Sequence, residues 1–182
     1  MIQKRTPSKL FWICLLIPLL VLVSMLIKPV STKMYGEEVV LATIPIDPRD
    51  LFYGDYVLLD LEIEEIDAKL IEPSLLEKLE KGEFYGEIPV YVSLRKGEGG
   101  IYEAASLSKQ KPKDLFIKGK MSPYFEENSL HIKSVRVDYG IDRFYVEEGT
   151  GLKLEEQARK GKVLVSVKIR NGYPVITEIK GE

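Results

Sequence analysis

The residues best suited to chemistry in this chain lie together in one polar segment. Asp47, Arg49, Asp50 and Asp55 fall within nine residues, with Gly54 among them. Two carboxylates held close together can act as general acid and base, so Asp50 and Asp55 could hydrolyse a bond. An arginine beside them could instead hold the carboxylate of a ligand or partner. The same residue types are common in turns, where they bond nearby backbone amides.

The rest of the sequence argues against most enzyme classes. The single histidine, His131, lies in an alternating segment typical of a strand, and the single cysteine, Cys14, lies in the apolar N-terminal run. One histidine excludes a multi-histidine metal site, and the glycine-rich residues 97–100 lack the lysine and helix of a phosphate loop. The aspartate spacing does not match an EF-hand, although an all-carboxylate calcium site stays open. We therefore predict a non-enzymatic protein with no catalytic residue, cofactor or metal.

The N-terminal segment has the length and composition of a membrane span. Residues 10–27 are 18 consecutive uncharged residues with basic residues on both sides. As a helix they reach about 27 Å, close to the thickness of a bilayer hydrocarbon core. A cleaved secretory signal is the alternative, but it usually has a shorter apolar run and a small-residue cleavage site. We predict that residues 10–28 anchor the chain in the bilayer.

The charge distribution predicts the orientation of that anchor. The first 33 residues contain five of the 26 basic residues and none of the 28 acidic ones, so residues 34–182 carry a net charge of −7. The basic excess before the span favours a cytoplasmic N-terminus. We expect residues 1–9 to form a short cytoplasmic tail and residues 34–182 one domain outside the cell membrane. An acidic domain of this kind is a poor candidate for nucleic-acid binding.

The hydrophobic pattern after the span mostly alternates with a period of two, which is typical of half-buried strands. We expect strands at residues 39–46, 55–63, 88–94, 101–107, 115–121, 130–138, 163–169 and 173–179. Pro89 indicates a sheet edge, and a slip in alternation between Ile132 and Val135 suggests a bulge. Leu59 and Leu61 should share the buried face of their strand.

Turn and cap residues complete the predicted fold. Asn171-Gly172 lies between two alternating runs and favours a two-residue type I′ turn. A capping box at Ser74 and Glu77 predicts a short helix that ends at Gly82, and residues 152–160 predict a second one. The sequence therefore predicts a mainly β fold, an antiparallel β-barrel or sandwich with two short helices, after one N-terminal transmembrane helix.

Two blocks of the sequence carry a family resemblance. Gly54-Asp55-Tyr56 and Leu59 fit the motif for which the GDYXXLXY family of membrane-anchored prokaryotic proteins is named, except that position 61 is leucine. Residues 139–149 are similar to a second family pattern, an aromatic residue and glycine followed by an acidic-glycine ending. The resemblance implies a protein of unassigned biochemical function that is associated with multi-pass membrane proteins.

These observations give one leading hypothesis and one alternative. The candidate binding residues, taken from both blocks, are Asp47, Arg49, Asp50, Gly54, Asp55, Tyr56, Tyr139, Arg143, Tyr145, Glu147 and Glu148. The leading hypothesis is a membrane-anchored accessory protein whose extracytoplasmic domain uses these residues to bind a multi-pass membrane or envelope protein. The alternative is an envelope hydrolase or small-ligand-binding protein that uses the aspartate and arginine cluster. Each residue also has a structural reading as turn, cap or solvated-face chemistry.

Overall fold

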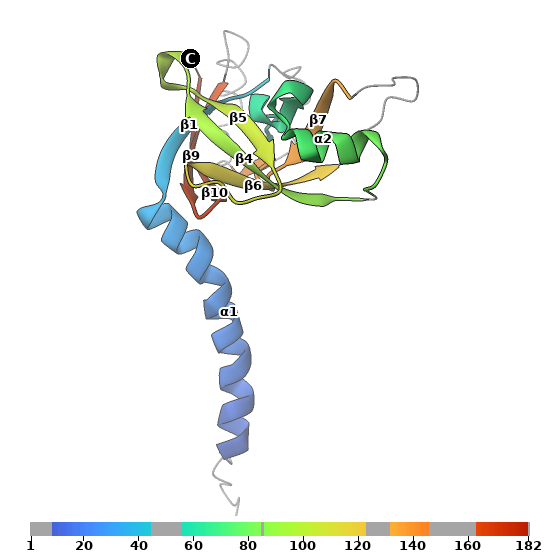
Figure 1. Cartoon of the computed structure of the whole chain (residues 1–182). Coiled ribbons are helices and arrows are strands. Elements are labelled where there is room, and N and C mark those ends of the chain that lie inside the picture. The colour runs from blue at the N-terminus through green and yellow to red at the C-terminus, as the bar shows by residue number, and fades with distance from the viewer. Residues whose placement is uncertain (1–8, 45–55, 85, 123–131, 146–162, 182) are drawn as a thin grey trace, which may run out of the picture.

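A long apolar helix and a β-domain make up the chain. The computed structural model describes residues 9–44, 56–84, 86–122, 132–145 and 163–181. Helix α1 (Lys9–Tyr35) extends away from the domain (Figure 1). Its apolar side chains from Trp12 to Ile27 are exposed on every face of the helix. A helix that is apolar all round needs a protein core or a membrane to cover it. Its stretch Trp12–Tyr35 is long and apolar enough to cross a bilayer, which is compatible with a single-pass anchor.

The domain is built mainly of short strands. In the described part of the chain the strands are β1 (Glu37–Ala42), β2 (Tyr56–Leu58), β3 (Glu65–Asp67), β4 (Ile88–Lys96), β5 (Tyr102–Ser108), β6 (Phe116–Ser122), β7 (Ser134–Asp138), β8 (Arg143–Tyr145), β9 (Val163–Arg170) and β10 (Tyr173–Gly181). Helix α2 (Pro73–Glu80) and the 3-10 turns η1 (Glu62–Glu64), η2 (Ala68–Leu70) and η3 (Glu98–Gly100) connect them.

The paired strands are antiparallel. One sheet has the order β3-β7-β6-β4-β5, a second has the order β1-β9-β10, and β2 pairs with β8 alone. An isolated parallel bridge links Val40 on β1 to Ile101, the residue before β5, and the amide of Lys118 on β6 donates to the carbonyl of Gly172, 2.8 Å away. The sheets thus form a nearly closed barrel, which confirms the predicted mainly β fold.

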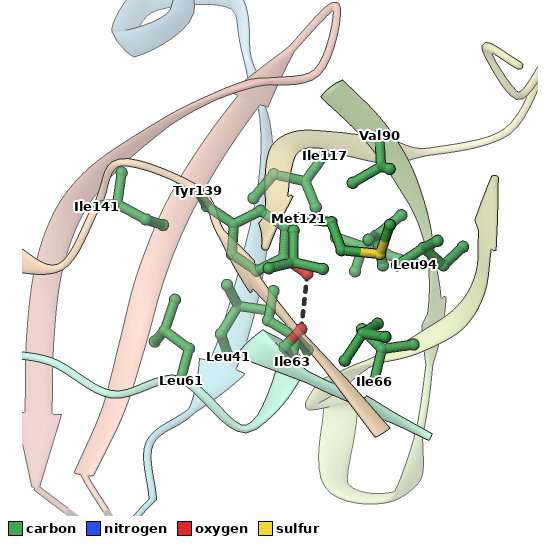
Figure 2. Packing of buried hydrophobic residues seen from close by; sticks show 14 of the residues in the cluster. Leu41, Leu61, Ile63, Ile66, Val90, Leu94, Ile117, Met121, Tyr139 and Ile141 are labelled. Atoms are coloured by element: carbon green, nitrogen blue, oxygen red, sulfur yellow. Dashed lines mark hydrogen bonds between the residues drawn. The ribbon is translucent and has the colours of Figure 1, made fainter. Parts of the chain in front are cut away.

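The core follows from alternation along the longer strands. On β4 every second residue from Ile88 to Leu94 is buried, and β9 buries Val165, Val167 and Ile169. Tyr139 lies within the same core cluster, and its hydroxyl donates to the carbonyl of Ile63 at 2.6 Å (Figure 2). This bond satisfies two polar groups that would otherwise destabilise the interior.

The predicted strand over residues 55–63 is wrong beyond Leu58, although its apolar residues were assigned to the core correctly. Leu59 and Leu61 are buried, as expected. The amide of Leu59 still donates to the carbonyl of Asp142, and the backbone then turns because the amide of Glu64 donates back to the carbonyl of Leu61 and closes η1. A turn that buries alternate residues has the same sequence pattern as a strand.

The first predicted short helix begins before its predicted cap. Glu72 is the N-cap and Pro73 takes the first helical position, where its missing N–H leaves no bond unmade. The Ser74 hydroxyl donates to the Glu72 carboxylate, so the capping box is wrong. Gly82 ends the helix as predicted, with φ of +66°. The second predicted helix, residues 152–160, lies outside the described residues.

The remaining local predictions have mixed outcomes. Asn171 and Gly172 adopt φ of 52° and 78° in a two-residue turn, which confirms the type I′ hairpin. Pro89 on β4 pairs with Lys120 on β6, whereas β5 pairs with β4 only from Tyr91 onward. Among the described strands, Pro89 therefore has no partner on its β5 side, which confirms the predicted edge position. The slip before Val135 marks the start of β7 rather than a bulge, because β7 keeps its register with both neighbours.

Candidate functional site

The two motif blocks meet in a two-stranded sheet, which we call the motif ribbon (β2 and β8). Tyr56 lies opposite Tyr145 in the antiparallel register, and Leu58 lies opposite Arg143. The amide of Leu59 donates to the carbonyl of Asp142 at 2.8 Å and extends the pairing past the end of β2. Residues from the two blocks, distant in the sequence, therefore form one continuous structure.

Buried side chains fix the base of the motif ribbon to the core. Leu59 and Leu61 follow β2, and Tyr139 and Ile141 precede β8; all four are buried. Between the latter two, Gly140 takes φ of +69°, and its amide donates to the Asp138 carboxylate at 2.7 Å. A side chain would be strained at that φ, so the glycine of the second block is required by the turn.

Tyr139, a predicted binding residue, lies in the core. Only 6% of its surface is exposed, and its hydroxyl is used by the carbonyl of Ile63. Burial, with a smaller contribution from the nearby Glu64 carboxylate, raises the pKa of Tyr139 far above its ordinary value. The phenol therefore stays protonated and holds the second block against the end of the first.

Strand alternation presents other residues of the second block to solvent. Tyr145 is 72% exposed, whereas Phe144, on the opposite face of β8, is half-buried against the core. Arg143 is exposed, and its Nε lies 3.3 Å from the Asp142 carboxylate. The motif ribbon thus has an inner face that anchors it and an outer face that carries an arginine and a tyrosine.

Most of the other predicted site residues cannot be placed. Tyr56 is located by its backbone in β2. Six further candidates lie outside the described residues: Asp47, Arg49, Asp50, Asp55, Glu147 and Glu148. Gly54 and His131 lie outside them too. The proximity of the aspartate cluster to the outer face of the motif ribbon stays a prediction.

A buried carboxyl group that the sequence did not single out lies beside this region. Glu64, on η1, is only 6% exposed, and Arg136 on β7 donates to it at 3.0 Å. Burial and the neighbouring Asp60 raise the pKa of Glu64 to about 7, and Arg136 opposes that rise. Glu64 lies in a run of acidic residues, so the sequence gave no sign that it is buried. Its burial comes from the packing of η1 against β7.

The Glu64 carboxyl opens onto a pocket of about 440 Å³. The residues that line it are Ile44, Asp60, Glu64, Glu65, Ser122, Ser134 and Arg136. A carboxyl group with a pKa near 7 can exchange protons at neutral pH, but buried carboxyl groups with a purely structural role also have perturbed pKa values. In the described ranges no group of three or more His, Cys, Asp or Glu side chains could hold a metal ion.

Comparison with known proteins identifies a family for most of the chain. A family model described as GDYXXLXY protein matches residues 18–179. The match covers both motif blocks and part of α1, and it confirms the resemblance seen in the sequence. Searches of curated proteins and of solved structures found no match.

Proposed function

The chain belongs to the GDYXXLXY family, and we propose that it is a membrane-anchored, non-enzymatic accessory protein whose motif ribbon binds another membrane protein. The observation that carries the proposal is the pairing of β2 with β8. It joins the two blocks of the family motif into one surface, and that surface carries the exposed Tyr145. Tyrosine and arginine are enriched where proteins bind one another, because each gives a large contact area and a polar group.

The junction between α1 and the domain supports a role at the membrane surface. The Lys168 ammonium group on β9 donates to the carbonyl of Lys33 at 3.0 Å, and Arg170 donates to the carbonyl of Ser31 at 3.3 Å. These cations satisfy carbonyl groups at the C-terminal end of α1, where the helix dipole is negative. A helix end bonded in this way holds the domain in one orientation relative to the span.

Gly36 tightens the same junction. Its amide donates to the carbonyl of Thr32 at 2.8 Å. A Cβ atom at this position would lie 2.5 Å from the Thr32 carbonyl oxygen and 3.1 Å from the amide nitrogen of Ile169. The absence of a side chain thus lets β1 leave the helix and pair with β9 at once, so no flexible linker separates span and domain. The motif ribbon is then held at a fixed distance from the membrane span, which suits binding to a partner in the same membrane.

The chemistry of the described residues also favours binding over catalysis. The shifted carboxyl of Glu64 is engaged by Arg136, which contacts Asp60 as well. A carboxyl group bonded in this way can hold the turn of η1 without taking part in a reaction. The proposed location is the cell membrane, with the N-terminus in the cytoplasm and the domain outside, and it rests on the charge asymmetry around the span.

Affinity capture from detergent-solubilised membranes tests this function. We expect the full-length chain to retain one dominant membrane protein, Tyr145→Ala to retain at least fivefold less, and Lys69→Ala to retain as much as the wild type. Lys69 is a suitable control because its side chain is 89% exposed and lies on η2, outside the motif ribbon. A thermal melt of each variant excludes unfolding as the cause.

The hydrolase alternative gives a different result. If equal capture by all three proteins is accompanied by turnover of chromogenic ester, phosphoester or peptide substrates, the binding function is wrong. Loss of that turnover in Asp50→Asn and Asp55→Asn would then assign the activity to the predicted aspartate pair.

A further inference from the structure

A second pocket lies where α1 meets the β-domain, and we call it the junction pocket. It encloses about 480 Å³. Three parts of the chain line it: one face of α1, strand β6 with the turn that follows β7, and the β9–β10 hairpin. The lining residues that matter here are Ile27, Lys28, Lys118, Arg170 and Tyr173. Figure 1 shows α1 joining the domain at the end where β1, β9 and β10 lie.

The junction pocket is basic although the domain is acidic. Lys28, Lys118 and Arg170 contribute to its lining, and none of the described residues that line it is acidic. Residues 34–182 carry a net charge of −7, so this concentration of positive charge is a local exception. A concave site lined by two lysines and an arginine favours a phosphate anion, which both kinds of side chain bind well.

Close packing fixes the strands that carry two of these basic residues. The amide of Lys118 donates to the carbonyl of Gly172, 2.8 Å away, and fixes the hairpin turn against β6. A Cβ atom at Gly172 would clash with the Phe116 ring, so the hairpin turn can pack against β6 only because residue 172 has no side chain. Arg170, two residues before Gly172, is held to α1 through the carbonyl of Ser31. The pocket is therefore preformed by backbone contacts.

The position of the pocket along α1 favours a phospholipid headgroup over a free phosphate ion as its ligand. The uncharged run ends at Ile27 and the first cation, Lys28, follows directly. Tyr35 and Tyr173 are 70% and 42% exposed at the same end of the helix. Aromatic side chains are enriched where a span leaves the hydrocarbon core and enters the headgroup layer. At that level phospholipid headgroups are the abundant anions, and the apolar Ile27 suits the start of an acyl chain better than it suits a free ion.

We propose that the junction pocket binds the phosphate of an anionic phospholipid headgroup, with Lys28, Lys118 and Arg170 as its basic residues. The inference rests on the proposed membrane span but not on the proposed protein partner. A bound lipid would join α1, β6 and the β9–β10 hairpin and restrain the domain at the membrane surface.

Native mass spectrometry of the full-length protein released from detergent tests the proposal. The probes are phosphatidylglycerol and phosphatidylcholine of identical acyl composition. The test variant is Lys28→Gln/Lys118→Gln, and the control is Lys69→Gln/Lys180→Gln. The control removes the same charge at two exposed lysines outside the pocket. A lysine near an anionic lipid surface strengthens binding by about fivefold, so we expect about 25-fold weaker phosphatidylglycerol binding in the test variant.

Each outcome supports or overturns the proposal. Preference for phosphatidylglycerol in the wild type and the control, lost in the test variant, supports it. Equal retention of the two lipids, or equal retention by the two double variants, overturns it. If millimolar inorganic phosphate alone raises the melting temperature as much as phosphatidylglycerol does, the pocket binds free phosphate and the lipid assignment is wrong. None of these results depends on whether a protein partner is captured.

Discussion

Glu64→Gln should make the domain more stable at alkaline pH and leave it unchanged in acid. Glu64 is buried and has a pKa of about 7 in the folded chain, against an ordinary value of 4.5. A raised pKa means that the folded state prefers the protonated form. Its stabilising contribution is therefore complete below pH 4.5 and is lost as the pH rises through 7. Glutamine has nearly the same shape as the protonated acid and never ionises, so it should keep that contribution at every pH.

The size of the effect follows from the shift. A pKa difference of 2.5 between the two values corresponds to about 3 kcal/mol of stability at 1.36 kcal/mol per pH unit. Wild-type protein should lose up to about 3 kcal/mol from this group between pH 5 and pH 8, and the variant should not. Arg136 is 64% exposed and still has Asp60 as a partner in the variant, so it keeps a counter-charge.

Thermal melts of the full-length protein in detergent, followed by far-ultraviolet circular dichroism between pH 5 and pH 8, measure the difference. Glu65→Gln is the matched control: it removes the same charge one residue away, and Glu65 is exposed and bonded to the Ser134 hydroxyl. If the melting temperatures of the wild type and Glu64→Gln change in parallel across this pH range, ionisation of Glu64 does not destabilise the fold and the reasoning is refuted.

Three further substitutions test the packing around the site by the same melts. Tyr139→Phe removes the bond to Ile63 and leaves a buried carbonyl unpaired, so it should cost about 1–3 kcal/mol; an unchanged melt would mean that water replaces the hydroxyl. Leu61→Ala should cost about 2–5 kcal/mol, because the side chain is fully buried and its loss leaves a cavity; a loss below this range would mean that the core closes around the gap. Gly172→Ala should cost more than about 1 kcal/mol, because φ is +78° and the added carbon meets the Phe116 ring; full stability would show that the hairpin turn can move away from β6.

Local sequence signals predicted the parts of the fold that depend on neighbouring residues. The β9–β10 hairpin could be predicted because Asn171-Gly172 tolerates positive φ and the residues on either side alternate between apolar and polar. Strand β4 could be predicted from the same alternation. The end of α2 followed from Gly82, but its start did not, since Pro73 fixes the first turn more strongly than Ser74 can cap it.

Contacts between distant segments could not be read in the same way. Alternation predicts which face of a strand a residue lies on, but it does not predict which strand pairs with it. The sequence therefore predicted that the two motif blocks form one site, but not that Tyr56 lies opposite Tyr145. Tyr139 was assigned to that surface and lies instead in the core, because an aromatic residue beside a glycine suits either place. The burial of Glu64 and the junction pocket both arise from segments that meet only in the folded chain.

Photo-crosslinking in intact membranes tests the central claim most directly. A photoreactive phenylalanine derivative replaces Tyr145 on the motif ribbon in one full-length protein and Lys69 on η2 in another, and both sites are exposed. Irradiation should attach the protein carrying the probe at position 145 to one membrane protein of discrete mass, and the protein carrying it at position 69 should give no such product. Equal products from both positions, or none from position 145 in membranes where the partner is captured, would contradict the assignment of the motif ribbon as the binding surface.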